Sequence, residues 1–170
     1  MIKLQYCNIH TIEDLDIKKY LNELPETMRN DVVRYRNVSD QKARLLARLM
    51  LMKALEQTKS LSSINNWKRD RYNKPHVDGW DSFSISHSGE IVVFCHSISE
   101  VGIDIEKTID QNYVELTKYF HDKEQQFIFD AQNIQEAFFE VWVKKEAFLK
   151  AIGVGIVDGL KINCLNEKLF

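Results

Sequence analysis

The run VGIDIEK at residues 101–107 places the strongest constraint on the fold, because it alternates apolar and acidic side chains. In a β-strand, successive side chains point to opposite faces, so this spacing predicts a strand with Asp104 and Glu106 side by side. Ile103 and Ile105 would then face a hydrophobic core. Two adjacent carboxylates on such a strand repel each other and lose hydration, so the arrangement requires a nearby positive charge.

The order of the other segments predicts an α+β fold, in which an antiparallel sheet and its helices are segregated along the chain. Further strands are predicted at residues 2–9, 83–89, 91–98 and 160–165, and the middle two form a β-hairpin. Helices are predicted at residues 14–24, 26–35, 39–59, 111–119, 123–129 and 135–152. The mixed aromatic and basic stretch at 67–80 is predicted as loop and turn. The 170 residues, 44% of them hydrophobic, suit a single domain spanning residues 1–170.

The composition excludes several classes of protein. A formal net charge of -2 argues against a globally basic nucleic-acid binder. No run approaches the ~18 apolar residues of a membrane helix, and there is no signal-peptide pattern. Three scattered cysteines are too few for a disulfide framework or a zinc site. We therefore expect a cytoplasmic protein without nucleic-acid or membrane partners.

Charge is spread unevenly along the chain. Residues 29–53 contain seven Lys and Arg against two acids, whereas residues 100–146 contain eleven acids against five lysines. A phosphate-bearing ligand together with a divalent metal would use both regions. Solvated helix faces would give the same pattern, so charge alone leaves both interpretations open.

The predicted helix at 135–152 carries a third carboxylate that could join the acid pair. Glu146 and Lys150 are four residues apart and therefore share one helix face. On its own, this spacing is typical of a surface ion pair. Beside Asp104 and Glu106, however, Glu146 would complete an oxygen-rich site of the kind that Mg²⁺ prefers.

Five segments in matching order and spacing resemble the Sfp-type 4′-phosphopantetheinyl transferases of the holo-acyl-carrier-protein synthase superfamily. They are YNKPHV (72–77), FSISHSGEIVVFCHS (83–97), VGIDIEKT (101–108), FHDKE (120–124) and WVKKEAFLKAIGVGI (142–156). The resemblance extends from about residue 25 to residue 156. The acid pair followed by the pattern W-x-x-K-E-A-x-x-K is its most specific part.

The resemblance implies transfer of the 4′-phosphopantetheine arm of coenzyme A to a serine hydroxyl of an acyl or peptidyl carrier protein. Adenosine 3′,5′-bisphosphate would be released. Asp104, Glu106 and Glu146 would bind Mg²⁺, and Lys150 would contact a phosphate. Glu146, or a water molecule bound to the metal, would deprotonate the carrier serine. The other implied site residues are Lys74 and Pro75 near the adenine, His87 with Ser86 and Ser88 at the 3′-phosphate, Arg44 (one position beyond the matching Ala43), and Glu124 as a further acidic position.

The family architecture has two pseudo-symmetric halves, which correspond here to about residues 1–102 and 103–170. Family members continue with further strands beyond this point, so the second half is expected to be incomplete. The protein would then be a monomer, or a homodimer that covers the open sheet. Two functions fit these expectations. One is an active transferase whose partners are coenzyme A and an acidic carrier protein, and the other is a coenzyme A-binding regulatory protein that has lost turnover.

Overall fold

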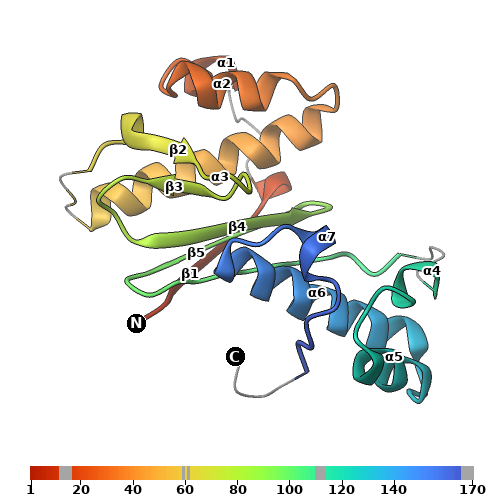
Figure 1. Cartoon of the computed structure of the whole chain (residues 1–170). Helices are drawn as coiled ribbons and strands as arrows, with labels where there is room; N and C mark the ends of the chain where they lie inside the picture. The colour runs from red at the N-terminus through yellow and green to blue at the C-terminus, as the bar shows by residue number, and fades with distance from the viewer. Residues whose placement is uncertain (12–16, 59, 61, 110–113, 166–170) are drawn as a thin grey trace.

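The computed structural model describes residues 1–11, 17–58, 60, 62–109 and 114–165, and its centre is a three-stranded antiparallel sheet (Figure 1). The strand order is β1 (Lys3–Asn8), β5 (Ile91–Ser97) and β4 (Ser82–Ser88). The α+β class with an antiparallel sheet is therefore confirmed. The two pseudo-symmetric halves stay a prediction.

Helices cover both faces of this sheet. On one face lie α1 (Ile17–Leu21), α2 (Glu26–Val33) and α3 (Val38–Gln57), and on the other lies α6 (Ile134–Ile152) (Figure 1). The shorter helices on the α6 side are α4 (Val114–Thr117), α5 (Asp122–Phe129) and α7 (Ile156–Gly159). The predicted helices are thus confirmed, although residues 14–16, 59 and 111–113 lie outside the described part of the chain. Among the described residues, no helix has both the length and the apolar character that crossing a membrane requires.

The main hydrophobic core lies between α3 and the sheet. Its fully buried side chains include Leu45 and Leu51 of α3, Phe83 of β4, and Val92 and Phe94 of β5. Burial of one such side chain contributes about 1.5–3 kcal/mol, so this layer sets where α3 sits. A second cluster, built around Phe120, Ile128, Phe138 and Val141, packs α5 against α6.

The predicted hairpin is formed by β4 and β5, with Ser88 opposite Ile91. Gly89 lies in its turn with φ +55°, a left-handed conformation that glycine adopts without strain. Phe83 and Ile85 of β4 pack toward the main core. Side chains alternate along a strand, so the serines of β4 point to the opposite sheet face, toward α6.

The prediction of a strand at residues 101–107 is wrong. This stretch, which we call the acidic segment, runs along the serines of β4, and serine hydroxyls accept hydrogen bonds from its main chain. The N–H groups of Val101, Ile103 and Lys107 donate to Ser82, Ser84 and Ser88 at 3.4, 3.1 and 2.8 Å. A β-ladder consists of hydrogen bonds between the main chains of two strands, and a serine hydroxyl is a side-chain group. The alternation of apolar and acidic residues is therefore present here without a β-strand.

Residues 160–165 also form no strand, contrary to the prediction. Their main chain bonds to two buried side chains of the helical layer. The carbonyl of Ile162 accepts from Lys145 at 2.6 Å, and the N–H of Cys164 donates to Glu124 at 2.8 Å. The alternation of apolar and polar side chains in this six-residue stretch does not distinguish this arrangement from sheet pairing.

A small second sheet is present where the sequence predicts only loop and turn. It pairs β2 (Trp67–Arg69) with β3 (Pro75–Val77) in antiparallel register. Each strand has three residues, which is too short to show a periodic pattern. This hairpin carries Arg69 and Pro75 toward α3, where both line the same cavity.

Gly102 allows the acidic segment to lie directly on α6. A Cβ atom at this position would lie 1.9 Å from Ala147 O and 2.5 Å from Ala151 N. Both are main-chain atoms of α6, so they cannot rotate away as a side chain would.

We therefore expect Gly102→Ala to lower the free energy of unfolding by about 3 kcal/mol, the upper end of the usual cost of overpacking. The matched control is Gly155→Ala, because a Cβ atom there meets nothing within 4 Å. Urea denaturation of both variants measures the difference. Similar losses in the two variants would contradict the close approach of the acidic segment to α6.

Candidate functional site

Most of the residues predicted for the site meet in one pocket of about 340 Å³. Its walls come from α3, β4, the β2–β3 hairpin, the acidic segment and α6. The predicted residues that line it are Arg44, Pro75, Ser86, His87, Asp104, Glu106, Glu146 and Lys150. The pocket has an acidic end on the α6 side and a basic end on the α3 side.

An ion pair between α6 and the acidic segment organises the acidic end. Lys150 Nζ donates to Asp104 Oδ1 at 2.5 Å, and Ser86 Oγ donates to the same oxygen at 2.7 Å. The Lys150 ammonium therefore supplies the positive charge that the adjacent carboxylates require. Asp104 Oδ2 is buried without a hydrogen-bond partner among the described residues, so an acceptor is free for a further ligand.

Two more carboxylates belong to this end. Glu106 Oε2 accepts a hydrogen bond from Ser88 Oγ at 3.0 Å. Burial raises the pKa of Glu146 above its ordinary value, Lys150 opposes this rise, and the charges of Asp104 and Glu106 add to it. In the described part of the chain, no three His, Cys, Asp or Glu side chains are grouped as a metal site.

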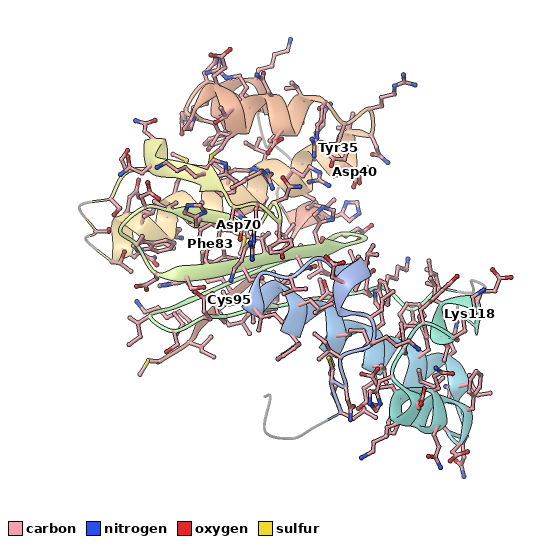
Figure 2. The ribbon with its side chains drawn as sticks, in the orientation of Figure 1. Tyr35, Asp40, Asp70, Phe83, Cys95 and Lys118 are labelled. Atoms are coloured by element: carbon pink, nitrogen blue, oxygen red, sulfur yellow. The ribbon has the colours of Figure 1, made fainter. Side chains whose placement is uncertain are left out.

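Arg44, Arg48 and His87 form the basic end. The Arg44 guanidinium stacks on Tyr35, with its Cζ 3.6 Å from the ring centre, near the start of α3 where Figure 2 labels Tyr35. Burial lowers the pKa of Arg48 to about 10, so its guanidinium stays charged at neutral pH. The Nε atoms of both arginines are buried and have no hydrogen-bond partner within the described residues. Burial and then the charge of Arg44 lower the pKa of His87, so this imidazole is neutral at pH 7.

Sequence reasoning did not assign Ala47, Arg48 and Ile85 of the pocket lining, nor two residues of one short strand, Trp67 and Arg69. Both belong to β2, and Arg69 Cζ lies 5.6 Å from the ring centre of Trp67. The concentration of basic residues at 68–74 is the signal that could have identified Arg69. That signal does not reveal which arginine turns toward the pocket.

Lys74 and Ser88 line neighbouring cavities instead of this pocket. Lys74 lines a cavity of about 200 Å³, and Ser88 lines another of about 630 Å³. The predicted residues shared with the pocket are Pro75 and Lys150 in the first cavity, and His87 and Glu106 in the second. The structure therefore places Lys74 and Ser88 beside the pocket.

Glu124 is absent from the described lining of these cavities, and the structure separates it from the other acids. Its carboxylate is fully buried and pairs with Lys145 Nζ at 2.8 Å. It also accepts hydrogen bonds from the N–H groups of His121 at 3.0 Å and Cys164 at 2.8 Å. These contacts tie α5, α6 and the chain after α7 together, so the carboxylate has a structural role here.

Comparison with known sequences identifies the family to which this chain belongs. Residues 13–99 match the family described as "4'-phosphopantetheinyl transferase, N-terminal", and residues 100–167 match the "4'-phosphopantetheinyl transferase superfamily". The chain is 34% identical over 160 residues to 4'-phosphopantetheinyl transferase gsp of Aneurinibacillus migulanus, covering 92% of this chain and 68% of that protein.

Two Bacillus proteins are also similar. Identity is 30% over 170 residues to 4'-phosphopantetheinyl transferase psf-1 of Bacillus pumilus, with 94% of this chain and 72% of that protein covered. It is 26% over 145 residues to 4'-phosphopantetheinyl transferase Sfp of Bacillus subtilis, with 82% and 64% covered. The chain therefore belongs to the 4′-phosphopantetheinyl transferase superfamily.

Proposed function

We propose that this protein transfers the 4′-phosphopantetheine group of coenzyme A to a serine hydroxyl of an acyl or peptidyl carrier protein. Adenosine 3′,5′-bisphosphate is the second product, and the reaction depends on Mg²⁺. The observation that carries this proposal is the two-ended pocket, in which three carboxylates and Lys150 lie opposite Arg44, Arg48 and Arg69.

Coenzyme A suits such a pocket because its phosphates form two separate groups. The pyrophosphate contains the bond that breaks, and the 3′-phosphate is a monoester elsewhere on the nucleotide. Phosphoryl-type transfer depends mainly on positioning and on neutralising charge at the reacting phosphates. Carboxylates and Lys150 at one end, and guanidiniums at the other, give each phosphate group a partner of suitable chemistry.

The chemistry of the acidic end fits a hard divalent cation. Asp104 Oδ2 is a buried acceptor without a partner in the described structure, and the mutual repulsion of three carboxylates is the arrangement that such a cation relieves. Asp104, Glu106 and Glu146 would hold Mg²⁺. When bound, it would neutralise the charge that develops on the 5′-phosphate of the departing adenosine 3′,5′-bisphosphate.

Two residues of α6 have direct roles in this proposal. Lys150 is 31% exposed, so its ammonium can contact a substrate phosphate as well as Asp104. Glu146 accepts the proton of the carrier serine hydroxyl as the hydroxyl oxygen attacks phosphorus. Without a bound metal, burial raises the pKa of Glu146 and so increases the affinity of this carboxylate for a proton.

The test is intact mass spectrometry of an apo acyl carrier protein incubated with this protein, coenzyme A and Mg²⁺. We expect a gain of one phosphopantetheine group, and no gain when EDTA is added. An unmodified acyl carrier protein and an unmodified peptidyl carrier protein, in the presence of Mg²⁺, would reject the proposed function.

Asp104→Asn should reduce the rate of transfer by at least about a hundredfold, because it removes a charge that both Lys150 and the metal require. The fold should persist, since Lys150 is partly exposed and can turn toward water. The control is Asp130→Asn, an exposed acid at the end of α5, which should keep its activity. Unchanged transfer by Asp104→Asn would exclude Asp104 from the metal site.

Glu146→Gln should change stability in a pH-dependent way. A carboxyl whose pKa is raised on folding binds its proton more tightly in the native state, so the native protein loses stability as pH rises above the ordinary value of 4.5. The Gln variant escapes this loss and should therefore be the more stable protein at pH 7, with no difference below pH 4.5. Denaturant unfolding curves of both proteins across this pH range measure the difference in the free energy of unfolding. If the difference in the free energy of unfolding between the two proteins were the same at all pH values, ionisation of Glu146 would not destabilise the native state.

A further inference from the structure

An acid that is not part of the described pocket lining lies behind the arginines at the basic end of the pocket. Asp31 of α2 is not among the described residues that line the pocket. Its Oδ2 nevertheless accepts a hydrogen bond from Arg69 Nη2 at 2.5 Å and lies 3.7 Å from Arg48 Nη2. Arg69 is on β2 and Arg48 is on α3, so one carboxylate connects three separate elements.

Asp31 is one of several contacts that hold these guanidiniums against the pocket wall. Arg69 Nη1 donates to Asn73 O at 3.0 Å, and Arg48 Nη1 donates to Arg44 O at 3.1 Å. The Cζ atoms of Arg48 and Arg69 lie 5.9 and 5.6 Å from the ring centre of Trp67. Asp31 is the acid that both guanidiniums share, so its removal would leave two neighbouring positive charges without the carboxylate that both contact.

The electrostatics of Asp31 indicate that it remains ionised. Partial burial raises the pKa of Asp31, but the hydrogen bond from Arg69 and the charges of Arg69, Arg34 and Arg48 lower it overall. Arg34 Nη1 lies 3.6 Å from Asp31 Oδ1, and the Arg34 side chain is 58% exposed. The carboxylate therefore carries a full negative charge beside the buried Arg48 guanidinium.

The charge at this end suits one kind of phosphate. Arg44, Arg48 and Arg69 line the pocket here, and the carboxylate of Asp31 lies against two of them. Such a concentration of guanidiniums suits a phosphate monoester, which carries about −1.5 to −2 at pH 7. Arg48 lines the pocket, and its Nε is buried without a hydrogen-bond partner in the described structure, so this side chain has a donor for such a ligand.

The identity of the phosphate at the basic end follows from the proposed function, on which this inference rests. The pyrophosphate contains the bond that breaks, so it must lie at the acidic end beside Lys150. The phosphate that remains on coenzyme A is the 3′-monoester. We propose that Asp31 is a positioning residue that fixes Arg48 and Arg69 for this monoester, and that it thereby makes the pocket select coenzyme A over dephospho-coenzyme A.

Steady-state kinetics with both substrates tests this role. Asp31→Ala should raise the KM for coenzyme A about tenfold, which corresponds to ~1.4 kcal/mol, and should leave kcat nearly unchanged. The KM for dephospho-coenzyme A should hardly change, because that substrate lacks the monoester. Asp31→Asn retains an acceptor for Arg69 without the charge, so its KM should lie between those of the wild type and Asp31→Ala.

The matched control is Glu26→Ala. Glu26 is an exposed acid on the same helix, without an ion pair in the described structure, and its loss should change neither KM. Thermal melting shows whether Asp31→Ala is folded, and Asp31→Asn decides the question if it is not. Equal KM increases for the two substrates, or tighter binding of coenzyme A by the variants, would overturn the proposal.

Calorimetry separates this inference from the proposed function. Adenosine 3′,5′-bisphosphate should bind the wild-type protein more tightly than AMP, and Asp31→Ala should remove most of that preference. This comparison requires no carrier protein and no turnover. Absence of transfer together with this binding pattern would reject the proposed function alone, whereas equal binding of the two nucleotides by the wild type would reject the role of Asp31.

Discussion

The ion pair between Lys150 and Asp104 is the interaction on which the acidic end of the pocket depends. Asp104 is almost completely buried, with a side chain 2% exposed, and a buried carboxylate remains ionised only if a positive group and hydrogen bonds compensate it. Lys150 and Ser86 provide that compensation from α6 and β4. Because the pair joins α6 to the acidic segment and Ser86 ties both to β4, the position of the acidic segment and the direction of Lys150 are determined together.

The serines of β4 explain how carboxylates can stand beside a sheet without belonging to a strand. A hydroxyl both donates and accepts, so Ser88 accepts the N–H of Lys107 while it donates to Glu106. Ser82 does the same for Val101 and Glu100. A strand partner would offer main-chain groups to the main chain only. The serines instead orient the backbone and the carboxylates of the neighbouring segment at the same time.

Sequence reasoning was most successful where a long periodic pattern or a turn residue defined the element. The β4–β5 hairpin and α6 are present, and the shared face of Glu146 and Lys150 does reach the acid pair. It failed where side chains replaced main-chain partners, as at residues 101–107 and 160–165. Arg69 and the structural role of Glu124 were also missed, because both depend on contacts between residues distant in sequence, with Asp31 in one case and Lys145 in the other. Short range patterns contain no information about such partners.

Two neighbouring residues, Lys145 and Glu146, fix the rotation of α6 about its own axis. Adjacent residues on a helix point about 100° apart, so Lys145 can enter the cluster behind α6 while Glu146 faces the pocket. Lys145 is fully buried against Glu124 and the carbonyl of Ile162. A rotation of α6 about its axis would therefore expose an ammonium to an apolar interior before it moved Glu146 out of the pocket. The direction in which Glu146 points is thus fixed from another side of the helix, by residues outside the described pocket lining.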